Sequence, residues 1–78
     1  MAIFKVLKVG NLIEFYRANS TSEVIRHLPT EDWLLIEELS NTQLISLTLN
    51  VTKEPVKLID LVSDIQDDGL IASMIDYN

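Results

Sequence analysis

The chain has 78 residues, a mass of 8.9 kDa and a formal net charge of −6. A chain of this length has room for one small core, so residues 1–78 are expected to form a single globular domain. It contains no cysteine, which excludes disulfides, thiolate metal sites and cysteine nucleophiles.

The apolar fraction of 47% is high for so small a chain. Because a small domain has little interior, part of this apolar surface should stay exposed as a patch for a partner or a second copy. No apolar run is long enough for a membrane span, and the N-terminal run lacks the pattern of a signal peptide. We therefore expect a cytoplasmic protein without membrane contact.

Residues 3–9 and 12–17 are rich in branched and aromatic side chains and flank Gly10-Asn11, a two-residue loop typical of a β-hairpin. Charged side chains should give this hairpin a partly solvated face. They are Lys5, Lys8, Glu14 and Arg17.

Phe15 and Tyr16 are adjacent in the second strand of this hairpin and must point to opposite faces, so one of them is a candidate surface aromatic. An exposed aromatic beside basic side chains can stack on single-stranded bases. The net charge of −6 makes that interaction unfavourable, so direct nucleic-acid binding is not expected.

A short helix is expected at residues 21–28. Ser20 and Glu23 have the spacing of a capping box, and Pro29 disfavours helical conformation at the residue before it. His27 falls in the last turn, where a histidine most often interacts with the helix dipole.

Residues 33–39 and 43–51 are interpreted as a second hairpin. The second of these segments alternates apolar and polar side chains, which is typical of a half-buried strand. The first segment is ambiguous, because Thr30 could also cap a helix. The apolar residues would then lie all round that helix, which favours the strand.

Residues 55–68 are expected to form an amphipathic helix. Pro55 suits a first-turn position, and Gly69 suits the residue after the C-terminal end. Apolar residues recur with helical spacing at Leu58, Leu61, Val62 and Ile65.

Together these elements predict an α+β fold, with a small antiparallel sheet from two β-hairpins and two helices packed on one face. The alternative is a mainly β fold with three hairpins, in which Asp68-Gly69 turns between strands 58–66 and 70–77. In the α+β interpretation, residues 70–78 form either a last strand or a second short helix.

Charge is distributed unevenly along the chain. Residues 1–30 carry four cations and two carboxylates, a net charge of +2, whereas residues 31–78 carry two cations and ten carboxylates, a net charge of −8. Four carboxylates lie away from the apolar stripe of the helix expected at 55–68, and these are Asp60, Asp64, Asp67 and Asp68. Carboxylates bind hard cations, but these four lack the spacing of a calcium loop. Neither a metal nor a cofactor is expected.

Catalysis has no support in the sequence. None of the serines lies in a Gly-x-Ser-x-Gly turn, and the two glycines do not form a phosphate-binding loop. A chain of this size also has little room for a walled pocket. We do not expect an enzyme.

We expect instead a small acidic protein with a regulatory or inhibitory role, which docks on a larger macromolecule through its acidic C-terminal half. Such a surface could imitate nucleic-acid phosphates on a protein partner. The expected contact residues are Asp60, Asp64, Asp67, Asp68, Glu37, Glu38 and Trp33. The alternative is a structural subunit that forms a homo-oligomer through its surplus apolar surface or an open sheet edge.

Overall fold

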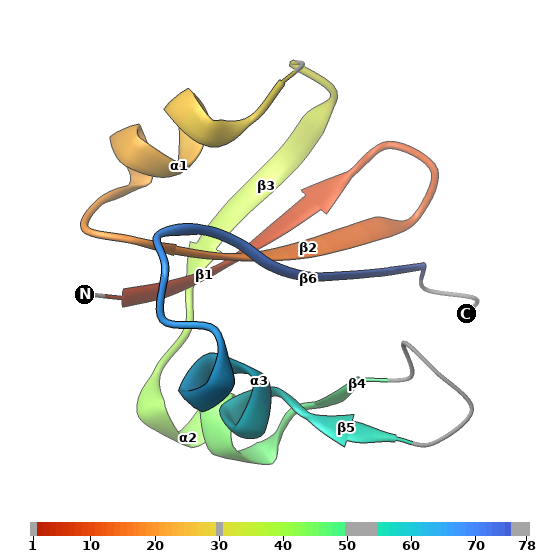
Figure 1. Cartoon of the computed structure of the whole chain (residues 1–78). Helices are drawn as coiled ribbons and strands as arrows, with labels where there is room; N and C mark the ends of the chain where they lie inside the picture. Colours follow the sequence, from red (N-terminus) through yellow and green to blue (C-terminus); the bar gives the residue numbers. More distant parts are fainter. Residues whose placement is uncertain (1, 30, 50–54, 76–78) are drawn as a thin grey trace.

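The computed structural model describes residues 2–29, 31–49 and 55–75. Their secondary structure is shown in Figure 1 and consists, in chain order, of β1 (Ala2–Lys8), β2 (Leu12–Ala18), α1 (Thr21–His27), β3 (Trp33–Glu38), α2 (Asn41–Ser46), β4 (Thr48–Leu49), β5 (Val56–Lys57), α3 (Leu58–Asp64) and β6 (Gly69–Ile75). The predicted α+β class with an antiparallel sheet is confirmed.

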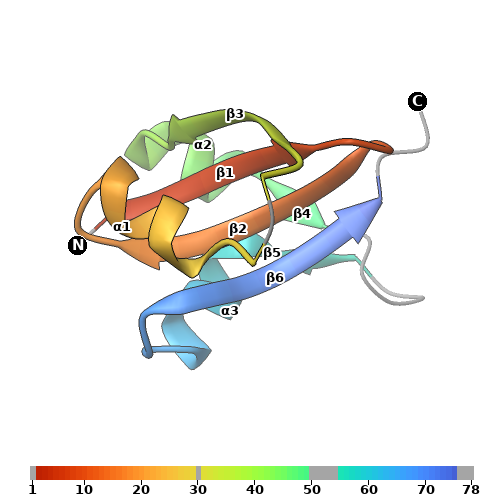
Figure 2. The ribbon, with the colours of Figure 1, turned by 90° about the horizontal axis from the view of Figure 1, so that it is seen from above.

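The main sheet has the strand order β3-β1-β2-β6, with every neighbouring pair antiparallel. Helix α1 covers one face, while α2, α3 and the short β4–β5 ribbon cover the other (Figures 1 and 2). The expectation that both helices pack on one face is therefore wrong. Each face has its own apolar core, because successive side chains of a strand point to opposite faces.

The core beneath α1 contains five buried residues, which are Phe4, Val6, Tyr16, Ala18 and Val24. The core on the other face, which we call the α2–α3 face, is built from Ile3, Ile13, Phe15, Leu49, Leu58 and Ile71. Phe15 and Tyr16 do point to opposite faces, yet both are buried. Neither is a surface aromatic, because helices cover both sides of β2.

The first hairpin is confirmed. Gly10 and Asn11 both have positive φ angles, +83° and +61°, a conformation that glycine and asparagine adopt at least cost. The connection is one residue longer than expected, since Lys8 pairs with Leu12 and leaves Val9 outside the ladder. The Val9 amide instead donates to the Asp32 carbonyl at 3.0 Å.

Helix α1 is confirmed and ends one residue earlier than expected. The Ser20 hydroxyl accepts a hydrogen bond from the Glu23 amide at 3.3 Å, as predicted for the N-cap. The Glu23 carboxylate reaches back to the Asn19 amide at 2.6 Å, one residue before the position of a standard capping box. Leu28 is extended, in keeping with the proline that follows it.

The predicted hairpin of 33–39 with 43–51 is wrong. The strand at 33–38 exists, but it pairs with β1, and residues 41–46 form a helix. The side chains of Ser40 and Gln43 each accept a hydrogen bond from the backbone amide of the other residue, which forms a capping box. This cap favours a helix at 41–46 in spite of the alternating apolar and polar side chains that predicted a strand. In the described part of 43–51, the strand is limited to Thr48–Leu49, which pair with Val56–Lys57. Residues 50 and 51 of the predicted strand lie outside the described residues.

The helix predicted at 55–68 is shorter than expected. It occupies Leu58–Asp64, because residues 56–57 after Pro55 pair with β4 instead of starting the helix. Residues 69–75 form a strand that pairs with β2. Of the two expectations for the tail, a last strand or a second short helix, the strand is therefore confirmed. The third hairpin is wrong, since its first strand is helix α3. Residues 76–78 of the tail lie outside the described residues.

Candidate functional site

Four of the predicted contact residues follow one another along α3 and the loop after it, from Asp60 in the first turn of the helix to Asp68 just before β6. Asp60 and Asp64 are on the helix, and Asp67 and Asp68 are in the loop between α3 and β6. All four are exposed. Within the described ranges, none of the four has a hydrogen-bonding or ion-pair partner for its carboxylate. We call these four residues the acidic surface.

The opposite side of α3 is anchored to the sheet. Leu58 is fully buried, and the rest of the predicted apolar stripe packs against the same core, namely Leu61, Val62 and Ile65. This confirms the spacing argument, although the helix stops at Asp64. The helix therefore presents its carboxylates to solvent from a fixed orientation.

A cation from β2 stabilises the C-terminal end of α3. The Arg17 guanidinium donates a hydrogen bond to the carbonyl of Val62, in the last turn of the helix. Carbonyls in that turn have no partner within the helix and carry the negative end of its dipole. Arg17 was expected on a solvated face, but it is half-buried in this contact.

The other three predicted contact residues lie on β3 and are divided between the two faces. Glu37 accepts a hydrogen bond from Gln43 Nε2 of α2 at 3.2 Å, which places it on the α2–α3 face. Glu38 is opposite Phe4, and Trp33 packs on the core beneath α1. Trp33 and α3, which carries Asp60 and Asp64, are therefore on opposite faces of the sheet.

Large apolar side chains are exposed at several places: Val9, Ile25, Leu34, Leu35, Ile45, Leu70 and Ile75. Leu35 pairs with Leu7 of the α2–α3 core, and Ile45 is on α2, so both lie on the same face as α3. Leu70 and Ile75 are on the edge strand β6. These residues hint at an interaction surface.

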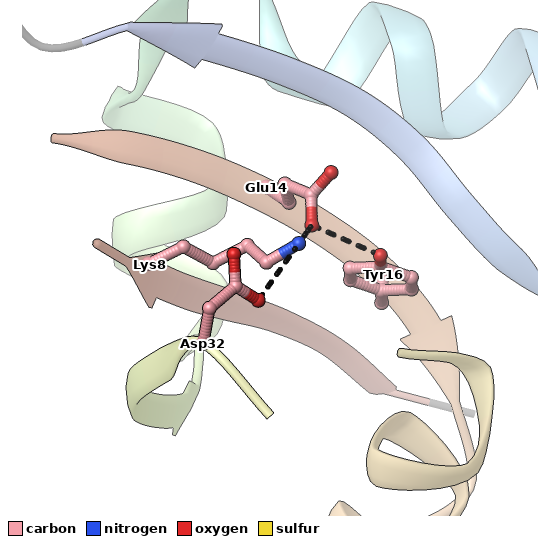
Figure 3. Close-up of polar contacts among 4 residues, drawn as sticks. All are labelled: Lys8, Glu14, Tyr16 and Asp32. Atoms are coloured by element: carbon pink, nitrogen blue, oxygen red, sulfur yellow. Dashed lines mark hydrogen bonds and ion pairs between the residues drawn. The ribbon is translucent and has the colours of Figure 1, made fainter. Parts of the chain in front are cut away.

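A buried polar cluster that was not predicted from the sequence lies on the α1 face (Figure 3). The Lys8 ammonium lies 3.1 Å from Glu14 Oε1 and 3.5 Å from Asp32 Oδ1. The Tyr16 hydroxyl donates to the same Glu14 oxygen at 3.1 Å. Lys8 and Glu14 are only 5% and 9% exposed, so the expected solvated face of the hairpin is wrong for these two residues.

Buried charge of this kind is stable only when it is paired and hydrogen-bonded. The hydrogen bond with Glu14 raises the pKa of Lys8 above its ordinary value, against the opposing effect of burial. Burial raises the pKa of the Tyr16 phenol to about 12, and the charge of Glu14 adds to the shift. At neutral pH the Lys8 ammonium and the Tyr16 phenol keep their protons, so neither is a base or a nucleophile. The cluster is better suited to stabilising the contact between strands than to catalysis.

The register of the first hairpin explains why the pair of Lys8 and Glu14 was not predicted. The expected two-residue loop places Lys8 opposite Ile13, which puts Lys8 and Glu14 on opposite faces. In the observed hairpin, which is centred on Gly10, Lys8 and Glu14 are diagonal neighbours on one face, within reach of each other. Asp32 could not be predicted either, because its position depends on the pairing of β3 with β1. That pairing also brings Asp32 to the end of the hairpin, where its carbonyl receives the Val9 amide.

Among the described residues, no three potential metal ligands gather into a cluster. No helix in those ranges has the length and hydropathy needed to cross a membrane. Comparisons with known proteins gave no match to any family model, any curated protein or any solved structure. Any function must therefore be inferred from the residues of this chain.

Proposed function

We propose that this protein is a non-enzymatic binding module that docks on a positively charged surface of a larger protein through the acidic surface. A regulatory or inhibitory role follows, because a bound module of this size occludes the basic site that it covers. The observation that carries the proposal is that Asp60, Asp64, Asp67 and Asp68 are all exposed and unpaired in the described part of the chain.

Part of this negative charge has an energetic cost in the free protein, although the helix dipole favours Asp60 in the first turn of α3. Asp60 and Asp64 are four residues apart on one helix, and like charges at that spacing destabilise a helix by about 0.2–0.5 kcal/mol. Asp67 and Asp68 add negative charge just beyond the negative end of the helix dipole. A basic partner relieves both effects on binding, and its attraction to the acidic surface accelerates association.

Affinity also requires apolar contact, a role first expected of Trp33. In this proposal Leu35 and Ile45 take that role, because they are exposed on the same face as α3. A partner that covers the acidic surface and extends toward α2 reaches these side chains.

The test begins with capture of partners from host lysate by tagged protein, at low and at moderate salt. The binding constant of the purified partner is then measured for the unchanged protein and for two variants of equal charge change. Asp64→Lys reverses one charge in the acidic surface. Glu31→Lys reverses one exposed charge before β3, away from α3.

We expect Asp64→Lys to weaken binding at least about tenfold, or about 1.4 kcal/mol, and Glu31→Lys to have a much smaller effect. Binding should also weaken as salt increases. If the two variants weakened binding equally, binding would depend only on the net charge of the protein, and the acidic surface would be rejected as the binding site. Binding that is insensitive to salt would reject it as well.

A further inference from the structure

Among the described residues, no strand pairs with the outer edge of β6. β6 is the last strand in the sheet order and pairs with β2 on one side only (Figure 2). Its sequence, Gly-Leu-Ile-Ala-Ser-Met-Ile, contains no charged residue and no proline. Natural edge strands are usually protected from pairing by such residues. We propose that β6 is a dimerisation edge, which pairs antiparallel with β6 of a second copy to form one continuous sheet of eight strands.

The opposite edge of the sheet differs in this respect. β3 ends in Glu37 and Glu38, and Asp32 immediately precedes it. Carboxylates on an edge strand oppose pairing, because a strand laid against them must accept charged neighbours. Both strands follow an aspartate, Asp32 before β3 and Asp68 before β6, but only β3 carries carboxylates within the strand itself.

The register of β6 with β2 determines which face each β6 side chain occupies. Leu70 is opposite Tyr16 and Ile75 is opposite Leu12, so both are on the α1 face. A register shift makes Ile71 an extra residue, and it packs in the core of the other face. Because of this bulge, the two large exposed side chains of β6 point to the same side although they are five residues apart.

These positions make β6 self-complementary. In an antiparallel pair, residues directly opposite each other point to the same face. A two-fold axis at Ser73 places Leu70 of each copy against Ile75 of the other, once the extra residue Ile71 is accommodated. Leu70 is 51% exposed and Ile75 is 50% exposed in the monomer, and each covers the other in the dimer. This mutual covering selects a second copy as the occupant of the edge.

In a second two-fold register, with Ile71 opposite Ala72, facing side chains of the two copies also point to the same face of the sheet. This register places Leu70 opposite Ser73 and brings Ile75 opposite Asp68, an exposed carboxylate. That arrangement leaves both large apolar side chains without an apolar neighbour across the interface. The axis at Ser73 is therefore the favoured one.

Electrostatics makes a distinctive prediction for this dimer. Each copy carries a net charge of −6, so two copies repel each other at low salt. The paired strands themselves carry no charge. Added salt screens the repulsion and strengthens apolar contact, so the dimer should tighten as salt increases. Docking through the acidic surface has the opposite salt dependence.

A single introduced cysteine tests the axis directly, because the chain has no cysteine of its own. Facing residues of antiparallel strands have Cα atoms about 4.5–5.5 Å apart, within the range of a disulfide. Ser73→Cys should therefore form a disulfide-linked dimer under mild oxidation. Ser46→Cys, at an exposed position on α2, is the matched control and should form no disulfide-linked dimer.

Sedimentation velocity over a range of protein concentrations measures the dimer without a cross-link. Ile75→Lys introduces a charge at the edge and should raise the dissociation constant at least about tenfold. Lys5→Ala, on the inner strand β1, should leave it unchanged. A protein that stays monomeric at the highest concentration and at high salt overturns the proposal. Cross-linking of Ser73→Cys no faster than Ser46→Cys overturns it too.

This inference does not depend on the proposed function. Loss of the dimer in Ile75→Lys with unchanged partner binding separates the two surfaces. Loss of partner binding in Asp64→Lys with an intact dimer does the same in the other direction.

Discussion

The Lys8 ammonium lies 3.1 Å from the Glu14 carboxylate, and both side chains are almost completely buried on the α1 face of the sheet. Lys8 ends β1, and Glu14 is in β2, so their contact joins the two central strands near the hairpin turn. Asp32 adds a second carboxylate from the start of β3. One buried cation thus contacts a carboxylate of β2 and the carboxylate of the residue that precedes β3.

Removal of Glu14 should destabilise the protein strongly. Glu14→Leu leaves the Lys8 ammonium buried with only the partly exposed Asp32 as a counter-ion, and breaking a buried pair typically costs about 3–5 kcal/mol. The double variant Lys8→Met, Glu14→Leu removes both charges and should recover most of that loss. Urea unfolding measures both, with Lys5→Met, on the other face of β1, as the control. A double variant less stable than Glu14→Leu would contradict this account.

Stability should fall at alkaline pH. The pKa of Tyr16 is raised from 10.0 to about 12 in the folded protein, and that of Lys8 is also raised. Folding therefore favours the protonated forms. Their contribution is complete below the unfolded pKa values and is lost as pH rises through the folded ones, between about 10 and 12 for the phenol.

Tyrosinate absorbance measures this titration directly. In a Tyr77→Phe variant the only tyrosine is Tyr16, and its phenol should ionise near pH 12, together with unfolding. The unfolding midpoint of Tyr16→Phe should show a weaker dependence on alkaline pH. Ionisation of Tyr16 in the folded protein near pH 10 would contradict its burial and its hydrogen bond to Glu14.

Loss of the capping box should destabilise α2. Ser40→Ala removes the hydroxyl that accepts the Gln43 amide at 3.2 Å, and loss of such a cap typically costs about 1 kcal/mol. Thr42→Ala, at an exposed position of the same helix, should have little effect. Urea unfolding of the two variants tests the difference, and equal stabilities would show that the cap contributes little.

Loss of Arg17 should loosen α3 and the acidic surface that it carries. Arg17→Met keeps an apolar stem but removes the hydrogen bond to Val62 and the charge at the helix end. Bonds of this charged type typically contribute about 1.5–3 kcal/mol. Hydrogen exchange of the α3 amides should accelerate, whereas Arg26→Met, at an exposed position in α1, should leave them unchanged. Unchanged exchange in Arg17→Met would mean that core packing alone holds the helix.

Local signals in the sequence determined several elements. Gly10 and Asn11 tolerate positive φ, which fixed the first hairpin, and Ser20 with Glu23 fixed the start of α1. The spacing of Leu58 and its apolar neighbours identified the buried side of α3, and with it the exposure of its aspartates. Each of these features depends on residues close together in the chain, so their chemistry is readable without the fold.

Only the tertiary structure decided the partners of the strands and the coverage of the faces. β3 pairs with β1, so Asp32 reaches Lys8, and Trp33 lies on the face opposite α3. β6, which carries no charge, pairs with β2 and with no other strand of the described residues. Alternation along a strand indicates which side chains share a face, but not which distant segment covers it. That choice depends on non-local packing, and it converted an expected solvated face at Lys8 and Glu14 into a buried ion pair.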